Sequence, residues 1–180
     1  MSALVDLWRR ASPTGLALLL LGVAAATIGG AWIFEALGHA PCELCLKQRI
    51  PYYAAIPLAA ATALAAQRGA ARLARVGFVL VALLFISGAA LAFYHSGVEL
   101  KVFAGPTECS GALKKAHSFD DFRSQIEKMK VPRCDAPTLF VLGLTLSNWN
   151  VLISAALAAA AVAGWRRSPA PPRPAPTESV

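Results

Sequence analysis

Residues 76–98 read VGFVLVALLFISGAALAFYHSGV, a run of 23 residues without a single charged side chain. A helix needs about 20 predominantly apolar residues to cross the hydrocarbon core of a bilayer. Three further uncharged runs lie at residues 11–34, 50–66 and 136–165. Only 15% of the 180 residues are charged, which leaves too little polar sequence to cover a soluble core. The sequence therefore predicts an all-α membrane protein.

The expected architecture is an antiparallel bundle of four transmembrane helices in a single domain, residues 1–165. We place the four spans at about 14–34, 50–66, 76–96 and 148–165, the last two being trimmed from longer uncharged runs by the spanning length. Outer loops are expected at 35–49 and 97–147, and a proline-rich, disordered cytoplasmic tail at 166–180. In the second span, Pro51 fits the first turn and Pro57 is expected to kink the helix.

The long outer loop contains a second, shorter helical pattern. Ser118 followed by Asp120 and Asp121 is typical of a capped helix start. Apolar residues then recur at helical spacing as far as Met129. This pattern predicts a short amphipathic helix, which could lie on the membrane surface or be an ordinary surface helix of the loop.

The first uncharged run could instead be a cleaved signal peptide, because Arg9 and Arg10 precede it and residues 24–26 are alanines. Its apolar segment is longer than a signal peptide requires, and further spans follow it. We therefore expect a retained membrane helix.

The net charge of +7 is distributed unevenly along the predicted topology. The N-terminal segment, the link at 67–75 and the tail together carry eight basic and two acidic residues. These segments flank the spans, so the positive-inside rule places both termini in the cytoplasm. The excess charge is thus an orientation signal, and we expect no nucleic-acid partner.

All four cysteines, Cys42, Cys45, Cys109 and Cys134, fall in the predicted outer loops. In bacteria that side of the inner membrane is oxidising and permits disulfides. Cys42 and Cys45 form a Cys-x-x-Cys motif at the start of a helix, where the two sulfurs can bridge and a thiolate is stabilised. Arg49, four residues after Cys45, adds a cation on the same helical face.

Three interpretations of the cysteines remain open at this point. Four cysteines can hold structural zinc, but the second pair lacks zinc-knuckle spacing, so we expect no metal. Two structural disulfides in a non-enzymatic membrane subunit are a second possibility. The third is a redox relay, in which thiol–disulfide exchange passes two electrons from one pair to the other. Cys109 and Cys134, 25 residues apart, are most simply joined by a loop disulfide.

Several features together resemble the DsbB family of membrane disulfide-forming proteins. They are Pro41-Cys42-Glu43-Leu44-Cys45 followed by Arg49, the long second loop with Cys109 and Cys134, and Leu142-Gly143-Leu144 followed by Trp149. The resemblance covers about residues 14–165. The Cys-x-x-Cys alone is weakly specific, whereas its combination with Arg49, the topology and the second pair is strongly specific.

The resemblance implies a thiol:quinone oxidoreductase of the bacterial inner membrane that reoxidises a periplasmic DsbA-like dithiol protein. Cys109 would be attacked by the partner's thiolate, which releases Cys134, and the electrons would then reach the Cys42–Cys45 disulfide. Cys45 would pass them to ubiquinone or menaquinone from the membrane pool. Arg49 would polarise a quinone oxygen and His95 would lie beside the quinone.

Each of these assignments has a simpler alternative. Arg49 could be a basic residue that snorkels at a helix end, and His95 an interfacial polar residue. Glu43 and Lys47 are expected to be solvated loop charges, and His39 an exposed loop residue. If the quinone site exists, Arg49, Cys45 and His95 should line one apolar pocket.

Two functional rivals also remain from the sequence. A paralogue serving a dedicated thiol partner would have the same motifs. A quinone reductase similar to the vitamin K epoxide enzymes would share four helices and a Cys-x-x-Cys, but that family places the motif near the last helix, whereas here it opens the second.

Overall fold

The computed structural model describes residues 11–105, 118–119, 123, 133–135 and 139–170. Three features that the sequence analysis named lie outside the described residues. They are Cys109, the predicted amphipathic helix beyond Phe119 (apart from Arg123), and the tail from residue 171. Four long helices and a two-stranded hairpin make up the described fold: α2 (Pro13–Ala36), α3 (Glu43–Gln67), α4 (Ala71–Glu99), β1 (Phe140–Val141), β2 (Leu144–Thr145) and α6 (Leu146–Arg167).

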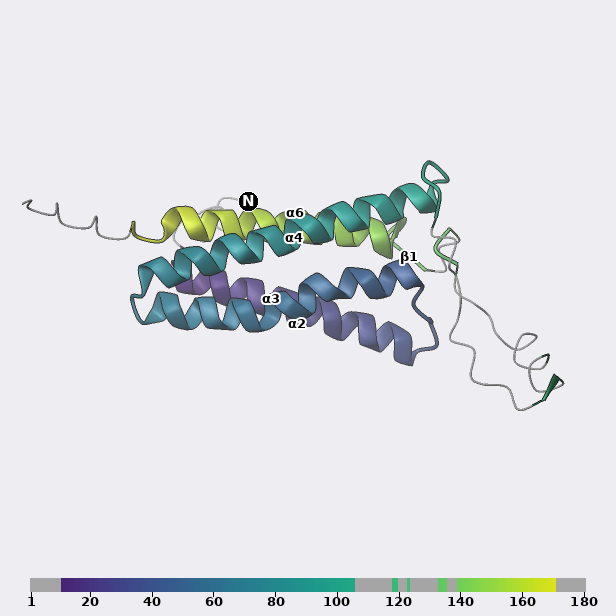
Figure 1. Ribbon diagram of the computed structural model, residues 1–180, viewed down its shortest axis with the longest axis horizontal. Helices are drawn as coiled ribbons and strands as arrows, with labels where there is room; N and C mark the ends of the chain where they lie inside the picture. The colour runs from purple at the N-terminus through teal and green to yellow at the C-terminus, as the bar shows by residue number, and fades with distance from the viewer. Residues whose placement is uncertain (1–10, 106–117, 120–122, 124–132, 136–138, 171–180) are drawn as a thin grey trace, which may run out of the picture.

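The four helices lie side by side and alternate in direction (Figure 1). Short links, residues 37–42 between α2 and α3 and residues 68–70 between α3 and α4, require neighbouring helices to run antiparallel. One end of the bundle carries the link 37–42, the end of α4 and the hairpin, and we call it the cysteine end. The opposite end, with the link 68–70 and the end of α6, is the arginine end, because Arg68, Arg72, Arg75, Arg166 and Arg167 lie there.

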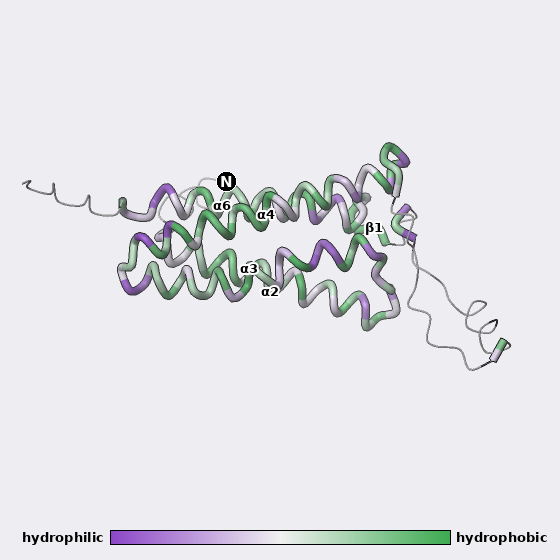
Figure 2. Tube along the Cα trace, viewed as in Figure 1, coloured by the Kyte–Doolittle hydropathy of each residue, from purple (hydrophilic) through white to green (hydrophobic). Residues whose placement is uncertain are grey.

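Three of the helices, α2, α4 and α6, are long and apolar enough to cross a membrane. The structure therefore supports a helical membrane protein. Helix α3 has 25 residues, but polar side chains and two prolines lower its apolar character. Figure 2 shows this polar segment in the first turns of α3, at the cysteine end. That α3 also spans the membrane remains a prediction.

Helix α3 begins much earlier than the uncharged run at 50–66 indicated. Cys42 is its N-cap, so residues that we expected in the loop 35–49 form its first two turns. Pro51 is consequently an interior residue of the helix, and its expected position in the first turn is wrong. Glu43 and Lys47 are likewise not loop charges, because they form an ion pair of 2.6 Å one helical turn apart.

Local sequence accounts for the other helix boundaries. The Ser12 hydroxyl accepts a hydrogen bond from the Gly15 amide at 3.1 Å, and Pro13 occupies the first turn of α2, where its missing N–H costs nothing. Thr145 caps α6 in the same way, through the Asn148 amide at 3.3 Å. Gly69, with φ of +71°, allows the tight link into α4.

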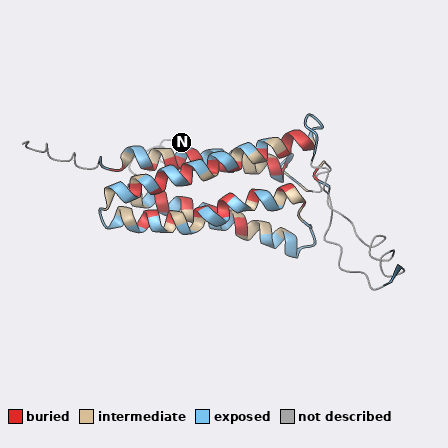
Figure 3. Ribbon diagram, viewed as in Figure 1, coloured by how far each residue is buried: buried red, intermediate tan, exposed pale blue. Residues whose placement is uncertain are grey.

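Most of the buried side chains form one apolar core along the bundle axis, and its largest fully buried members are Tyr52, Phe78 and Phe85. Figure 3 shows buried residues facing inward and exposed residues on the outer faces of the helices. Many of the exposed side chains are large and apolar, among them Leu83 and Ile86 on α4 and Leu152 on α6. An apolar exterior of this extent is expected for helices surrounded by lipid.

The hairpin precedes α6 and was not predicted. Its two central residues, Leu142 and Gly143, have φ of +51° and +82°, the left-handed pair that a tight two-residue hairpin turn requires. The Trp149 indole donates to the Val141 carbonyl at 2.9 Å and so fastens the hairpin to the first turn of α6.

Close packing of α3 against α4 depends on Gly77, and it yields a testable stability difference. A Cβ at this position would lie 2.2 Å from Thr62 Oγ1 and 3.1 Å from Thr62 Cβ. Because Thr62 is branched close to the backbone, the clash cannot be relieved by a flexible side chain. We expect Gly77→Ala to lower the free energy of unfolding by about 1 to 3 kcal/mol.

Thermal unfolding of the detergent-solubilised protein measures this effect. Gly29→Ala in α2 is the matched control, because a Cβ there meets no atom within 4 Å. It should be neutral or stabilising through the higher helix propensity of alanine. Equal melting temperatures for the two variants would contradict the proposed packing.

Candidate functional site

Cys42 and Cys45 meet at the first turn of α3. The Cys42 sulfur caps the helix by accepting a hydrogen bond from the Cys45 amide at 3.3 Å. The Cys42 thiol also donates to the Cys45 sulfur, with the two Sγ atoms 3.0 Å apart. The sulfurs are therefore within reach of a disulfide bond after a small rotation of the side chains.

The two thiols differ in acidity. The hydrogen bond from Cys42 to the Cys45 sulfur, together with burial, raises the pKa of Cys42 to about 12. The same hydrogen bond lowers the pKa of Cys45. Cys45 is therefore the thiolate of the reduced pair, and Cys42 holds the proton. Both residues lie before the membrane span predicted at 50–66.

His95, on α4, is the next group beyond Cys42. Its side chain is only 3% exposed, and its Nε2 atom lies 3.7 Å from the Cys42 sulfur. On the other side of the ring, the Gln48 amide nitrogen lies 2.6 Å from Nδ1. An amide nitrogen only donates hydrogen bonds, so Nδ1 is the acceptor and the ring proton resides on Nε2.

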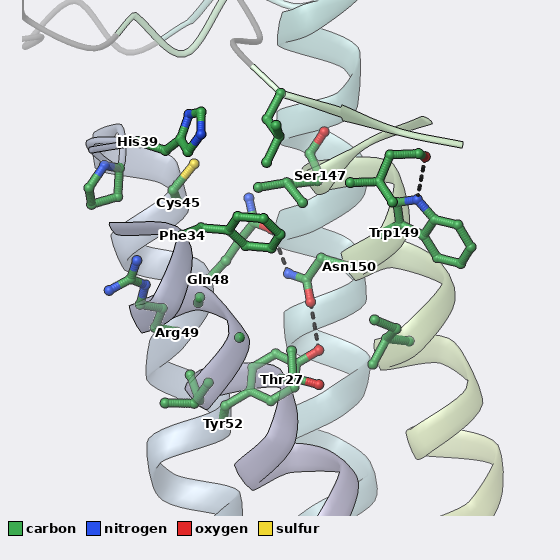
Figure 4. Close-up of a pocket in the computed structure, with 18 of the residues that line it drawn as sticks. Thr27, Phe34, His39, Cys45, Gln48, Arg49, Tyr52, Ser147, Trp149 and Asn150 are labelled. Atoms are coloured by element: carbon green, nitrogen blue, oxygen red, sulfur yellow. Dashed lines mark hydrogen bonds between the residues drawn. The ribbon is translucent and has the colours of Figure 1, made fainter. Parts of the chain in front are cut away.

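A chain of hydrogen bonds continues from Gln48 into the bundle (Figure 4). The Asn150 amide donates to Gln48 Oε1 at 2.5 Å, and the Tyr52 hydroxyl donates to Asn150 Oδ1 at 2.6 Å. Ser154 lies beside both, 3.0 Å from the Tyr52 hydroxyl. The chain, which we call the amide chain (Tyr52, Asn150, Gln48 and His95), joins α3, α6 and α4.

Glu99, the last residue of α4, lies near the Nε2 atom of His95, away from the Nδ1 atom that Gln48 contacts. Its Oε1 atom is 3.7 Å from His95 Nε2, and its side chain is 8% exposed. The hydroxyl groups of Thr145, at 2.6 Å, and Ser147 both donate to Oε2. The carboxylate is thus held by the hairpin and by the first turn of α6.

A cavity of about 540 Å³ opens beside these groups at the cysteine end. Most of its lining is apolar and comes from α2, α6 and the hairpin. The chemically active lining residues are Cys45, Gln48, Arg49, Tyr52, His95 and Asn150. Figure 4 shows Cys45, Gln48, Arg49 and Tyr52 along one helix, with Asn150 facing Gln48 and Tyr52. An apolar cleft with a few convergent polar groups is typical of a small-molecule site.

Arg49 has a partner that the sequence did not indicate. Its guanidinium donates to Glu35 Oε2, at the end of α2, at 2.7 Å. The Arg49 side chain is only 11% exposed, whereas Glu35 is largely open to solvent. The ion pair fixes the cation at the cavity wall and reduces the cost of placing it in an apolar setting.

A third cysteine joins the pair. Cys134 is buried in one cluster with Cys42, Leu44 and Val98, and Cys45 packs against that cluster. The neighbouring Asp135 is tied to the end of α4, because the Lys101 ammonium donates both to its carboxylate and to its main-chain carbonyl. This contact holds the segment that carries Cys134 over the first turn of α3.

The structure thus gathers most of the residues singled out in the sequence. Cys45, Arg49 and His95 line one cavity, and Cys42 and Cys134 lie beside it, whereas Cys109 is outside the described residues. His39 is exposed, as expected, yet it also lines the cavity.

Sequence reasoning missed several functional candidates. They are Glu35, Gln48, Tyr52, Glu99 and Asn150. One signal was available, because Asn150 and Tyr52 are polar residues inside otherwise apolar runs, and such residues mark functional positions in membrane helices.

Comparisons with known proteins agree with this arrangement. Residues 13–164 match the model of the family described as disulfide bond formation protein DsbB. An uncharacterized protein of Rickettsia prowazekii (strain Madrid E) is 24% identical over 143 residues, which cover 78% of this chain and 80% of that protein. No solved structure matches the chain. The matched region includes α2, α3, α4 and all but the last turn of α6, and the chain belongs to the DsbB family of disulfide-forming membrane oxidoreductases.

Proposed function

We propose that the protein is a thiol:quinone oxidoreductase that reoxidises a periplasmic DsbA-like dithiol protein. The observation that carries this proposal is the position of the Cys42–Cys45 pair at the wall of an apolar cavity between membrane helices. A quinone is a lipid-soluble ring with two oxygens, and the cavity offers apolar walls with a small number of hydrogen-bond donors.

The electron path follows from thiol–disulfide exchange. A partner dithiol reduces the Cys109–Cys134 disulfide and becomes a disulfide itself, so two electrons enter the protein. The resulting dithiol then reduces the Cys42–Cys45 disulfide, and the burial of Cys134 in one cluster with Cys42, against which Cys45 packs, supports this transfer. The bound quinone supplies the final two-electron acceptor, and the Cys42–Cys45 disulfide is formed again.

The residues of the cavity prepare this last step. Cys45 presents a thiolate to the cavity, because Cys42 and the start of α3 stabilise its negative charge. Arg49, held by Glu35, places positive charge at the cavity wall, where it stabilises negative charge on an oxygen. The apolar lining excludes water and strengthens both interactions.

The orientation is part of the same proposal. The arginine end faces the cytoplasm of a bacterial cell together with both termini, and the cysteine end faces the periplasm. The five arginines of the arginine end lie at the opposite end of the bundle from Cys42 and Cys45, which supports this placement through the positive-inside rule.

Cys45→Ser tests the function itself. Purified protein is mixed with reduced DsbA-like protein and either ubiquinone or menaquinone, and quinone absorbance is followed. We expect turnover with the wild-type protein and none above background with Cys45→Ser, because no thiolate then faces the cavity. Retained turnover in Cys45→Ser would rule out the proposed electron path.

Arg49→Ala tests the role of the cation. Loss of one charged hydrogen-bonding group should raise the apparent Kd for quinone about tenfold or more, while the disulfides still form. The quinone concentration dependence of turnover measures this. Lys47→Ala is the matched control, since Lys47 lies on the same helix but pairs with Glu43. If both variants keep the wild-type dependence, Arg49 has no part in the site.

The unequal acidity of the two thiols predicts selective modification. With a pKa of about 12, Cys42 is almost entirely protonated at neutral pH, whereas Cys45 ionises at lower pH than an ordinary thiol. Only the thiolate is alkylated rapidly. Brief iodoacetamide treatment of the reduced protein near pH 7, read by peptide mass spectrometry, should therefore label Cys45 before Cys42. Preferential labelling of Cys42 would contradict the assignment.

A further inference from the structure

A second cavity opens at the arginine end, between the start of α4 and the end of α6. It has a volume of about 310 Å³. We call it the outer groove, and its lining residues are Arg72, Arg75, Val76, Val79, Leu80 and Trp165. It lies at the far end of the bundle from Cys42 and Cys45, so the proposed redox chemistry makes no use of it.

The outer groove changes from polar to apolar along α4. Arg72 and Arg75 lie near the start of the helix, and the exposed side chains of Val76, Val79 and Leu80 follow toward its middle. From Arg72 to Leu80 the helix rises about 12 Å. The span predicted at 76–96 puts the two arginines outside the hydrocarbon core and the three apolar residues within it. This polarity matches a phospholipid, whose head group lies at the interface and whose acyl chains lie in the core.

Arg75 is held in place by the protein itself. Its guanidinium donates to the Ser168 carbonyl at 3.2 Å and lies over the Trp165 ring, 5.1 Å from the centroid. A guanidinium has five N–H donors, so the bond to Ser168 leaves others for a ligand. Because the side chain is already ordered, an anion that binds there loses less free energy to side-chain ordering.

The outer groove lies in a region of positive charge without a compensating carboxylate. The acidic residues that the structure describes, Glu35, Glu43, Glu99 and Asp135, all lie at the cysteine end. The N-cap of α4 is Ala70, which offers no side-chain hydrogen bond to the first turn. The amides and the dipole at a helix start favour an anion. Within the described part of the chain, charge complementarity therefore calls for an anion supplied by a ligand.

We propose that the outer groove binds an anionic phospholipid of the membrane leaflet at the arginine end. The phosphate is bound by Arg72 and Arg75 at the start of α4, and an acyl chain lies along Val76, Val79 and Leu80. A zwitterionic lipid fits less well, because its ammonium group is repelled by the two arginines. In the orientation proposed above, this leaflet is the cytoplasmic one, whose anionic lipids attract basic segments near its surface.

Native mass spectrometry of the full-length protein in a nonionic detergent tests the proposal by counting bound lipids. The protein is titrated with phosphatidylglycerol or, in parallel, with phosphatidylcholine that has the same acyl chains. We expect one phosphatidylglycerol to bind more tightly than any phosphatidylcholine. Arg72→Gln combined with Arg75→Gln should raise the apparent Kd for phosphatidylglycerol about 30-fold, or about fivefold for each arginine lost.

The matched control is Arg68→Gln combined with Arg166→Gln. It removes the same charge from the same end, but neither residue lines the outer groove, so the Kd should stay close to wild type. Arg72→Gln alone leaves the contacts of Arg75 with Ser168 and Trp165 in place and should still raise the Kd about fivefold. Unfolding temperatures close to wild type show that the variants remain folded.

The apolar part of the groove is tested separately with Val79→Phe. This change fills the groove without altering its charge, and the exposed position tolerates a larger side chain. It should raise the Kd for phosphatidylglycerol about tenfold, as overpacking of a filled apolar site does.

Equal affinities for the two lipids, or equal losses in the two arginine pairs, would indicate a diffuse attraction and overturn the proposal. Unchanged binding in Val79→Phe, with displacement of the lipid by inorganic phosphate, would identify a site for a free anion and overturn it as well. So would a dimer that excludes lipid and dissociates in the Arg72→Gln, Arg75→Gln variant, because a second copy would then occupy the groove. Quinone turnover is a separate measurement, so each of these results leaves the proposed function intact.

Discussion

The amide chain is the constraint on which the rest of the site depends. Its hydrogen bonds join α6 to α3 and α3 to α4 in a region with few other polar groups. A buried donor or acceptor without a partner costs about 1 to 3 kcal/mol, and more where no water can enter. Rotation of α3 would leave several such groups unsatisfied at once. The chain therefore fixes the rotation of α3, and with it the direction in which Cys45 and Arg49 face the cavity.

Charged side chains in and near the site also have partners. Arg49 at the cavity is paired with Glu35, and Glu99 nearby accepts hydrogen bonds from two hydroxyl groups and lies 3.7 Å from His95. Five arginines, Arg68, Arg72, Arg75, Arg166 and Arg167, lie at the other end, where Arg75 donates to the Ser168 carbonyl and packs on the Trp165 ring, 5.1 Å from its centroid. The apolar core of the bundle lies between these arginines and the cavity.

A long uncharged run is a local signal, and sequence reasoning used it to anticipate long helices. The expected ranges 14–34 and 76–96 lie inside Pro13–Ala36 and Ala71–Glu99. The uncharged run at 50–66 placed the start of α3 too late, because charged residues of its first turns look like loop residues, whereas the Cys-x-x-Cys motif correctly indicated a helix start. The family resemblance indicated Arg49 and His95 but not their partners. Glu99 lies four residues after His95 on the same helix, so helical spacing could have indicated that pair. Glu35 comes from α2, and its pairing with Arg49 follows from tertiary packing, which leaves no periodic trace in the sequence.

The N-cap of α3 has a consequence for energetics. Cys42 is at once the residue that begins the helix and a member of the redox pair, so oxidation and reduction alter the chemistry of the cap itself. Any difference in cap strength between the two states adds to the free energy of reduction. A helix cap contributes about 1 kcal/mol, which corresponds to about 20 mV for a two-electron couple. The first turn of α3 is thus a means of setting the midpoint potential of the protein, separate from the acceptor that it uses.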